Sequence, residues 1–286
     1  RLPNGNEARR QTSRPEGIVY RFSRSGRTPF PGSLTIDPAT PLAPNFMIHD
    51  HRPLWLKNSF QAFEHWYGKH FVAPHFAGLG FGALLMKPWN IDVFGAEIRV
   101  GNFLHMVTAK DRRVSLSTWH LGQQQGHIDI GNHVLICPGV RIDAASRITI
   151  GDNCMLAAGS YVTDADWHDL YDRTKPIGTT KAVTLHNNVW LGDGATVCKG
   201  VSIGENSIIG AGSVVATDIP ANVIAAGNPA QVIRALDPEQ ALVRREQIFE
   251  NPAALAEQNA KIDQYVLGPN TILGWARAKL RPKRGD

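Results

Sequence analysis

The residues of this chain best suited to chemistry surround one histidine. His168 lies in a polar segment, residues 163–183, and is flanked by Asp164, Asp166 and Asp169. An imidazole is mostly neutral near pH 7, so it can take a proton, and a neighbouring carboxylate can orient its second nitrogen. The pattern predicts general-base chemistry, with His168 as the base and Asp166 or Asp164 as the orienting acid. An exposed polar loop with a merely hydrogen-bonded histidine is the alternative.

The segment 163–183 interrupts a repeat of six residues. Aliphatic residues recur at every sixth position in three blocks: Ile130, Ile136 and Ile142; Ile150, Leu156 and Val162; then Leu185, Leu191, Val197, Ile203, Ile209 and Val215. A period of six fits neither a helix nor a single strand. It fits a chain that turns a corner after each short strand, so that stacked parallel coils bury the aliphatic side chains. We therefore expect an all-β solenoid over about residues 98–236, and loops that interrupt such a scaffold usually carry its function.

The residues ahead of the repeat, 1–97, are expected to form an N-terminal extension with one amphipathic helix. Its apolar side chains fall at helical spacing: Leu56, Phe60, Phe63, Tyr67 and Phe71. An aromatic stripe of this kind is far more often a packing surface than a cofactor site. We therefore assign this region no chemistry.

The residues after the repeat, 237–286, are expected to form a helical cap. The pairs Asp237-Pro238 and Asn251-Pro252 predict helix starts, because proline is favoured in a first turn. The second helix is expected to end near Gly268, and a third short helix to cover 272–280. Helices at the end of a solenoid cover strand edges that would otherwise stay open.

Composition narrows the class of protein. The 286 residues carry a net charge of +5 and are 43% hydrophobic, which excludes a disordered chain. Apolar runs are too short to span a bilayer, and the basic excess gathers at the ends rather than in the stripe of a nucleic-acid binder. Three scattered cysteines, Cys137, Cys154 and Cys198, argue against a disulfide framework and a thiolate zinc site. Without a signal-peptide pattern, we expect a cytoplasmic protein that binds no metal and no nucleic acid.

Three stretches of the chain carry a family resemblance. They read VTDADWHDLYDR (162–173), NNVWLGDGATVCKGVSIGENSIIGAGSVV (187–215) and ATDIPANVIAAGNPAQVIR (216–234). Together they resemble the maltose, galactoside and nodulation-type O-acetyltransferases of the hexapeptide-repeat family, and more closely their polysaccharide-biosynthesis relatives. The resemblance covers roughly residues 128–236. It implies a left-handed parallel β-helix and a homotrimer whose acetyl-CoA sites lie between neighbouring chains.

The resemblance also implies a reaction, direct acetyl transfer from acetyl-CoA in a ternary complex. His168 would take the proton of a hydroxyl whose oxygen attacks the thioester, and the amide of Gly192 or Asp193 would bind the oxyanion. Small residues would let pantetheine approach the backbone. The residues implied to hold acetyl-CoA are Trp190, Gly192, Asp193, Ala211, Gly212, Ala216, Thr217 and Arg234. Gln231 departs from the basic residue usual after the GNPA turn.

The acceptor is expected to be a sugar hydroxyl in a polysaccharide, lipopolysaccharide or glycolipid precursor. Side chains near His168 would bind it, and Trp119 could add a further ring for stacking on a sugar. The residues assigned to substrate are Trp167, Tyr171, Arg173 and His120. N-acetyl transfer to an amino sugar, transfer to a xenobiotic, and a scaffold without catalysis stay open.

The sequence disfavours two further classes of protein, a zinc-dependent carbonic anhydrase and a nucleotidyltransferase. His127 and His133 are six residues apart, whereas the zinc site of carbonic anhydrases on this fold needs three histidines, two of them five apart. A nucleotidyltransferase would need a glycine-rich nucleotide-binding domain ahead of the repeat, and no strand–loop–helix signature of that kind precedes residue 98.

Overall fold

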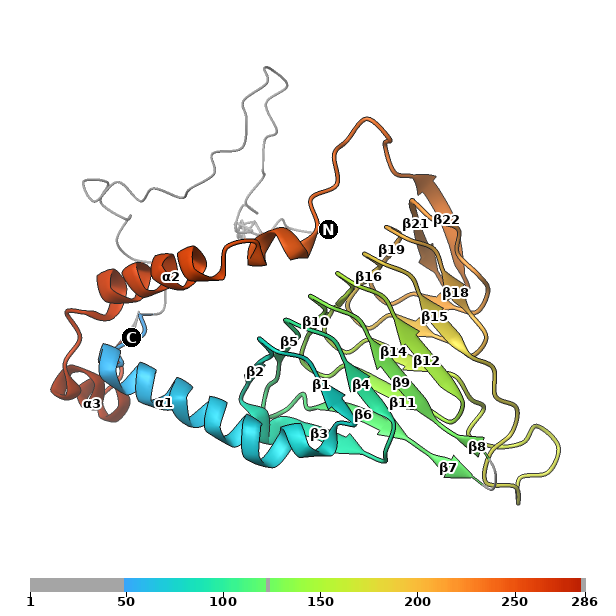
Figure 1. The fold of residues 1–286 in the computed structure, drawn as a ribbon, viewed down its shortest axis with the longest axis horizontal. Coiled ribbons are helices and arrows are strands. Elements are labelled where there is room, and N and C mark those ends of the chain that lie inside the picture. The colour runs from blue at the N-terminus through green and yellow to red at the C-terminus, as the bar shows by residue number, and fades with distance from the viewer. Residues whose placement is uncertain (1–48, 122–123, 284–286) are drawn as a thin grey trace, which may run out of the picture. The chain divides into compact units, whose positions relative to one another are not determined.

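The computed structural model describes residues 49–121 and 124–283, and its strands form three large sheets and a short hairpin. Successive strands enter the three sheets in turn, so the chain winds around a common core (Figure 1). The first sheet contains β1 (Gly78–Leu79), β4 (Ile98–Val100), β9 (His127–Ile130), β12 (Arg147–Ile150), β15 (Val183–Leu185) and β18 (Ser202–Ile203). The second contains β2 (Leu84–Met86), β5 (His105–Val107), β10 (Leu135–Ile136), β13 (Met155–Leu156), β16 (Trp190–Leu191), β19 (Ile208–Ile209), β21 (Val223–Gly227) and β22 (Ala230–Ala235). The third contains β3 (Ile91–Phe94), β6 (Val114–Thr118), β11 (Arg141–Ala144), β14 (Tyr161–Thr163), β17 (Thr196–Val197) and β20 (Val214–Val215).

Strands of successive coils pair in parallel, as Leu156 of β13 does with Leu191 of β16. Within these three sheets only β21 and β22 are antiparallel. Every aliphatic residue of the hexad pattern, from Ile130 to Val215, is at most 4% exposed. The inward position of these side chains is therefore confirmed. Fully burying each one stabilises the fold by about 1.5–3 kcal/mol, so the coils share one continuous core.

The chain turns three corners in each coil. The first corner leads from the first sheet to the second, the second corner from the second sheet to the third, and the third corner back to the first. Glycines with positive φ recur at the second corner, where a Cβ would be strained: Gly139, Gly159, Gly194 and Gly212. Two insertions enlarge the third corner. They are the hairpin of β7 (His120–Leu121) and β8 (Gln124–Gln125), and the loop of residues 164–182 between β14 and β15.

Helix α1 (Leu54–Tyr67) forms where the aromatic pattern predicts it, and η1 (Gly68–Val72) and η2 (Ala73–His75) extend it to the first coil. Glu64 accepts a hydrogen bond from the Lys87 amide at 2.9 Å, just beyond β2. Helix α1 also contacts β2 itself. It therefore covers the open edge of the second sheet.

The coils begin at Gly78, one coil ahead of the start expected near residue 98. Strands β1, β2 and β3 pair in parallel with β4, β5 and β6. The hexad pattern misses this coil because its connections are irregular. Phe81 and Gly82 form its first corner, and η3 (Pro88–Asn90) separates β2 from β3. The boundary of the N-terminal extension therefore moves to about residue 77.

The C-terminal helices α2 (Pro252–Leu267) and α3 (Ile272–Leu280) lie where the sequence predicts them. The helix expected from Asp237-Pro238 does not form, so that prediction is wrong. The amides of Glu239 and Gln240 bond back to Asp237, which closes a single turn. No helix follows this turn before the short 3-10 helix η4 (Arg245–Phe249).

Residues 244–249 pass along the first corner and hold the chain in this non-helical path. Asn153 and Glu246 exchange two hydrogen bonds, of 2.8 Å and 3.0 Å. The ring of Phe249 stacks on that of Phe103 with centroids 5.0 Å apart. Asn153 follows β12 and Phe103 follows β4, so these contacts fall on different coils.

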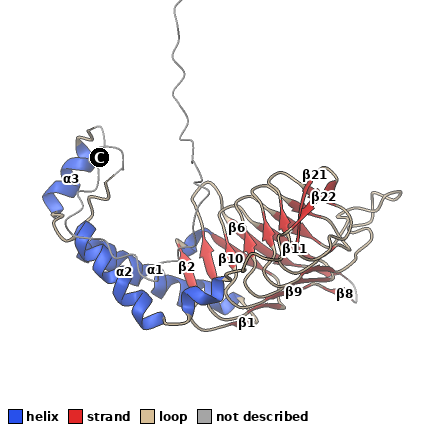
Figure 2. Ribbon diagram, turned by 90° about the horizontal axis from the view of Figure 1, so that it is seen from above, coloured by secondary structure: helices blue, strands red, loops and turns tan. Residues whose placement is uncertain are grey.

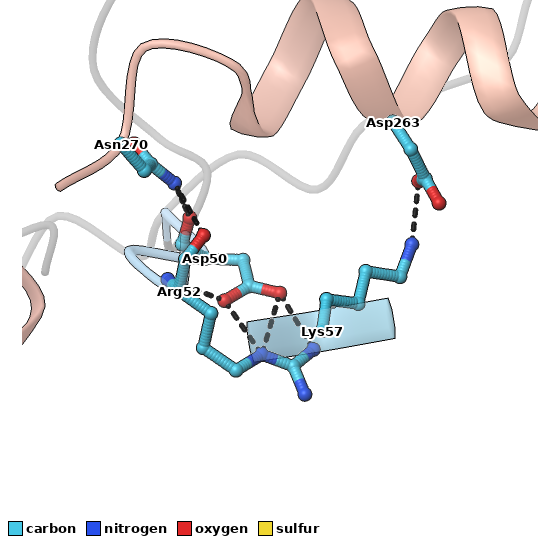
Figure 3. A network of polar contacts seen from close by, with 5 residues as sticks. All are labelled: Asp50, Arg52, Lys57, Asp263 and Asn270. Carbon is cyan, nitrogen blue, oxygen red and sulfur yellow. Dashed lines mark hydrogen bonds and ion pairs between the residues drawn. The ribbon is translucent and has the colours of Figure 1, made fainter. Parts of the chain in front are cut away.

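The C-terminal helices pack on α1. Lys57 of α1 and Asp263 of α2 form an ion pair of 2.5 Å, and the Asn270 side chain donates to the carbonyls of Asp50 and Arg52 (Figure 3). The three α-helices gather at the end of the stacked strands where β2 lies (Figure 2). At the other end β22 covers β21 in the second sheet. The expected cap thus lies at the N-terminal end of the coils.

None of the helices within 49–121 and 124–283 is both long and apolar enough to cross a membrane. The arginine-rich segment at the start of the chain, residues 1–30, lies outside the described residues.

Candidate active site

The 164–182 loop is fixed at its root by Asp164. This carboxylate is fully buried and accepts hydrogen bonds from the amides of Ala145 and Ser146, both at 2.8 Å. Burial raises the pKa of Asp164, although the amides that bond to it act in the opposite direction. Asp164 therefore attaches the loop to the turn that follows β11.

Asp166 attaches the loop to the next coil. Lys199, at the third corner after β17, donates to both carboxylate oxygens at 2.8 Å and 2.7 Å, and the Thr179 hydroxyl donates at 2.8 Å. The hydrogen bond from Lys199, and then that from Thr179, hold the pKa of Asp166 below its ordinary value. Gly178 lets the two limbs of the loop approach, because a Cβ there would lie 2.5 Å from the carbonyl oxygen of His168.

His168 itself is exposed on the first limb of this anchored loop, two residues after Asp166. The structure does not pair it with the expected acids: in the described part of the chain, no hydrogen bond joins Asp164 or Asp166 to its ring. Asp169 is also engaged, and accepts the amides of Tyr171 and Asp172, both at 2.9 Å. The carboxylates around His168 therefore build the loop, and sequence proximity overstated their part as orienting acids.

A polar and aromatic cluster lies beside the loop on the outer face of the third sheet. The Trp167 indole donates to the hydroxyls of Tyr161 and Thr163, both at 3.1 Å. The guanidinium of Arg141 sits 4.0 Å from the centroid of the Tyr161 ring. Arg141 also donates to Asp143 at 2.6 Å.

The cluster continues across the neighbouring strand. Asp143 accepts a 2.6 Å hydrogen bond from Ser117, whose hydroxyl in turn accepts the Trp119 indole at 3.0 Å. The rings of Trp119 and Trp167 meet edge to face, 5.9 Å apart. We call this set the outer network: Ser117, Trp119, Arg141, Asp143, Tyr161, Thr163 and Trp167. Sequence reasoning found only its two tryptophans.

A sequence signal for the rest exists in hindsight. Arg141 and Asp143 lie on either side of the inward Ile142, so both point outward from one strand. In the next coil of the same sheet the outward residue is smaller, Thr196 in register with Tyr161. The opposite charges of Arg141 and Asp143, two residues apart on one strand, were the sequence signal for an outward ion pair.

The other residues assigned to the acceptor are only partly brought together. His120 lies on the β7–β8 hairpin and contacts Gln125 at 3.1 Å, and Gln124 of the same hairpin donates to Thr180 of the loop at 2.9 Å (Figure 1). Hairpin and loop thus meet at the third corner. Tyr171 is 96% exposed, and Arg173 donates to the Asp169 carbonyl at 3.0 Å within the loop.

The residues implied to hold acetyl-CoA fall in several places. Trp190 is 44% exposed on the outer face of the second sheet, and Arg234 is exposed on β22. Gly192, Asp193, Ala211 and Gly212 line the second corner, whereas Ala216 and Thr217 follow β20 at the third corner. The second corner is open at Gly212, where an added Cβ would meet no atom within 4 Å. Gly192 is buried, whereas the small residues Ala211, Gly212, Ala216 and Thr217 are exposed and fit a thin pantetheine chain.

One of the two amides expected to bind the oxyanion is already used. The Gly192 amide donates to the Ile209 carbonyl at 2.8 Å as part of the pairing between coils. The expectation is therefore wrong for Gly192 as a donor. Asp193 follows it on the exposed side of the turn, and within the described residues its amide has no hydrogen-bond acceptor, so Asp193 is the donor that stays available.

Among the described residues, His, Cys, Asp and Glu side chains do not gather in threes in a way that could hold a metal ion. His133 is one of the two histidines compared above with the zinc ligands of carbonic anhydrases. Its ring stacks on that of Phe103, with the centroids 5.2 Å apart. The Cys154 thiol is buried, and burial raises its pKa to about 12. A buried thiol of this kind is a poor nucleophile.

Comparisons with known proteins agree with the repeat. Residues 182–217 match the family model described as bacterial transferase hexapeptide (six repeats), and residues 148–164 match the hexapeptide repeat of succinyl-transferase. The chain is 41% identical over 79 residues to galactoside O-acetyltransferase of Escherichia coli K12, and 39% identical over 97 residues to that of Lactococcus lactis IL1403. These alignments cover 27% and 34% of this chain and 38% of each relative, so the chain spans well under half of the length of these two relatives.

A solved structure of a galactoside acetyltransferase in complex with coenzyme A is 26% identical, with 64% of this chain and 82% of that chain covered and a TM-score of 0.41. The sequence matches fall on the coils and at the root of the 164–182 loop. In its repeats, this chain resembles the hexapeptide-repeat O-acetyltransferases.

Proposed function

We propose that this protein is an O-acetyltransferase that moves the acetyl group of acetyl-CoA to a hydroxyl of a sugar in a polysaccharide or glycolipid precursor. The observation that carries the proposal is the 164–182 loop. It interrupts repeats similar to those of galactoside O-acetyltransferases, is anchored to two coils, and presents His168 beside the outer network. The coils are proposed to wind in the left-handed sense of that family.

The proposed reaction is a direct transfer. His168 takes the proton of the acceptor hydroxyl as the oxygen attacks the thioester carbonyl, and the Asp193 amide stabilises the oxyanion. The tetrahedral intermediate collapses with cleavage of the carbon–sulfur bond, and the imidazolium returns its proton to the CoA thiolate. General-base catalysis of this kind contributes roughly 10²–10⁴-fold.

The distribution of these groups supports a trimer with sites between chains. His168 belongs to the third corner, whereas Asp193 and Gly212 belong to the second, and a sheet face separates these corners in one chain. A neighbouring copy that places its second corner against this third corner would complete the site. We propose that acetyl-CoA lies in that cleft, along Trp190 and the small residues of both corners.

The outer network supports a sugar as the acceptor. Its indole rings offer faces for stacking, while Asp143 and Arg141 offer an acceptor and donors for hydroxyl groups. The same groups would accommodate an amino sugar, so N-acetyl transfer is the alternative enzyme. A scaffold without catalysis is the other alternative, and it would have no need for a loop fixed by two buried or paired carboxylates.

The experiment is thiol release from acetyl-CoA, measured with a panel of sugars, amino sugars and simple alcohols. Release that depends on a sugar hydroxyl supports the proposal, and release only with amino sugars favours N-acetyl transfer. If no acceptor promotes thiol release, calorimetric titration tests whether the protein binds CoA. A protein that binds no CoA is not an acetyltransferase.

A further inference from the structure

We propose that the acceptor is an oligosaccharide and that a second carbohydrate subsite receives it at the far end of the third sheet. This inference rests on the proposed function. The subsite is a cavity of about 420 Å³ between η1 and the edge strand β3. It lies outside every residue assigned above to the acetyl-CoA or acceptor sites.

The cavity combines aromatic rings with one ion pair. Phe71 and Phe94, two of its lining residues, are 52% and 58% exposed, and the ring of Trp89 also faces it. Arg113 donates to both carboxylate oxygens of Asp92, at 2.6 Å and 2.5 Å. This bidentate pair leaves the cavity with donors and acceptors but little net charge.

These features fit a neutral sugar better than other ligands. Each sugar hydroxyl both donates and accepts, and its ring presents C–H faces that pack on aromatic side chains. The Asp92–Arg113 pair is about half exposed, so a lipid chain would lay apolar surface against a hydrated ion pair, and a phosphate would be repelled by Asp92. Cavities that hold small ligands are typically apolar with a few placed polar groups, and this one has that composition.

A line of aromatic rings joins the cavity to the proposed active site. Phe94 at the cavity rim lies 5.2 Å from Trp119, and Trp119 lies 5.9 Å from Trp167, the neighbour of His168. The rings follow β3, β6 and β14, with β11 between the last two. The two centroid separations place the end rings at most about 11 Å apart, which is still longer than one sugar ring.

Packing of α1 alone does not explain this line. The rings that serve helix packing, Phe60, Phe63 and Tyr67, surround Trp89. They reach the cavity through Trp89 and through Phe71, whose ring lies 4.9 Å from that of Tyr67, but they do not continue along the line. Phe94 contacts none of the α1 rings in the described residues and points instead to Trp119. Because the Phe94 ring is more than half exposed, it contributes little to the stability of the fold. Exposed aromatic rings of this kind are typical of a binding surface.

The test uses an array of neutral mono- to hexasaccharides as the binding probe. The intact chain, Phe94→Ala and Phe71→Ala are compared with Phe81→Ala, a phenylalanine that is 66% exposed at the first corner of the same coil. We expect at least one oligosaccharide to bind at least tenfold more tightly than its own monosaccharide. Phe94→Ala and Phe71→Ala should remove that gain, and Phe81→Ala should keep it.

Equal binding of oligosaccharide and monosaccharide, or no binding of any saccharide, would overturn the subsite. A change of oligomeric state in Phe94→Ala, seen by sedimentation, would also overturn it, because the face would then be an interface between copies. Thiol release from acetyl-CoA separates the two proposals. Length-dependent binding without thiol release leaves the subsite standing and removes the transferase. Thiol release with equal kcat/KM for short and long acceptors would leave the transferase standing and remove the subsite.

Discussion

Lys199 donates to both carboxylate oxygens of Asp166, at 2.8 Å and 2.7 Å, and so joins the loop that carries His168 to the following coil. The two side chains are 33 residues apart, and both are about 30% exposed. The position of His168 therefore depends on a pairing between insertion and repeat, and not only on the residues beside it.

Asp166→Asn is expected to destabilise the fold by about 0.5–1 kcal/mol at neutral pH, the value of a well-formed but partly exposed pair. Because the folded-state pKa of Asp166 is lowered, its stabilisation is present above the ordinary value of 3.8 and is lost as the pH falls through the folded value. Urea unfolding of both proteins at neutral pH and in acid measures this. A stability difference that persists at the lowest pH would contradict it.

Asp164→Asn is expected to cost about 1–3 kcal/mol, because an amide side chain has one acceptor oxygen for the two buried amides of Ala145 and Ser146. Asp169→Asn is the matched control. Asp169 also accepts two amides but lies at the surface, where water can replace a lost hydrogen bond, so its change should cost much less stability than that of Asp164. Chemical denaturation of the two variants gives the comparison, and equal losses would show that Asp164 is not the anchor.

Leu191 and Trp190 are neighbours with opposite roles. Leu191 is fully buried, and Leu191→Ala should lower the free energy of unfolding by about 2–5 kcal/mol. Trp190 is 44% exposed on the proposed acetyl-CoA path, so Trp190→Ala should weaken CoA binding with a much smaller loss of stability. Urea unfolding and calorimetric titration with CoA separate the effects. Unchanged CoA affinity in Trp190→Ala would remove this residue from the cofactor site.

Asp143→Asn tests the outer network. Loss of a hydrogen bond to a charged group costs about 1.5–3 kcal/mol, so kcat/KM for the acceptor should fall roughly 10–150-fold, mainly through KM. The KM for acetyl-CoA should not change. Asp129→Asn is the control, since Asp129 pairs with Arg147 on the first sheet. Similar kinetics for the two variants would mean that the network does not touch the acceptor.

The sequence predicts those parts of the fold that depend on local periodicity. Hexad residues such as Leu185 and Val215 are buried as expected, and the helix from Pro252 ends at Leu267 beside Gly268. The coil that begins at Gly78 escapes prediction because its corners do not keep the period. The non-helical path after Asp237 escapes it because contacts with distant coils decide that path.

The site is predictable only in part, because contacts between residues far apart in the sequence also shape it. The interruption of the repeat identifies the loop and His168, since an insertion is visible in one chain. The partners of Asp164 and Asp166 are not visible, because Ala145 and Lys199 come close only when the coils stack. A carboxylate near a histidine in sequence is thus weak evidence for a catalytic pair.

The central claim is that His168 is the base in acetyl transfer. Its most direct test is thiol release from acetyl-CoA with the active acceptor, for the unchanged chain and for His168→Ala. His168 is exposed, so the variant should fold, and circular dichroism checks that it does. Release should fall at least about a hundredfold in His168→Ala, with CoA affinity unchanged. Equal release by the two proteins would contradict the account.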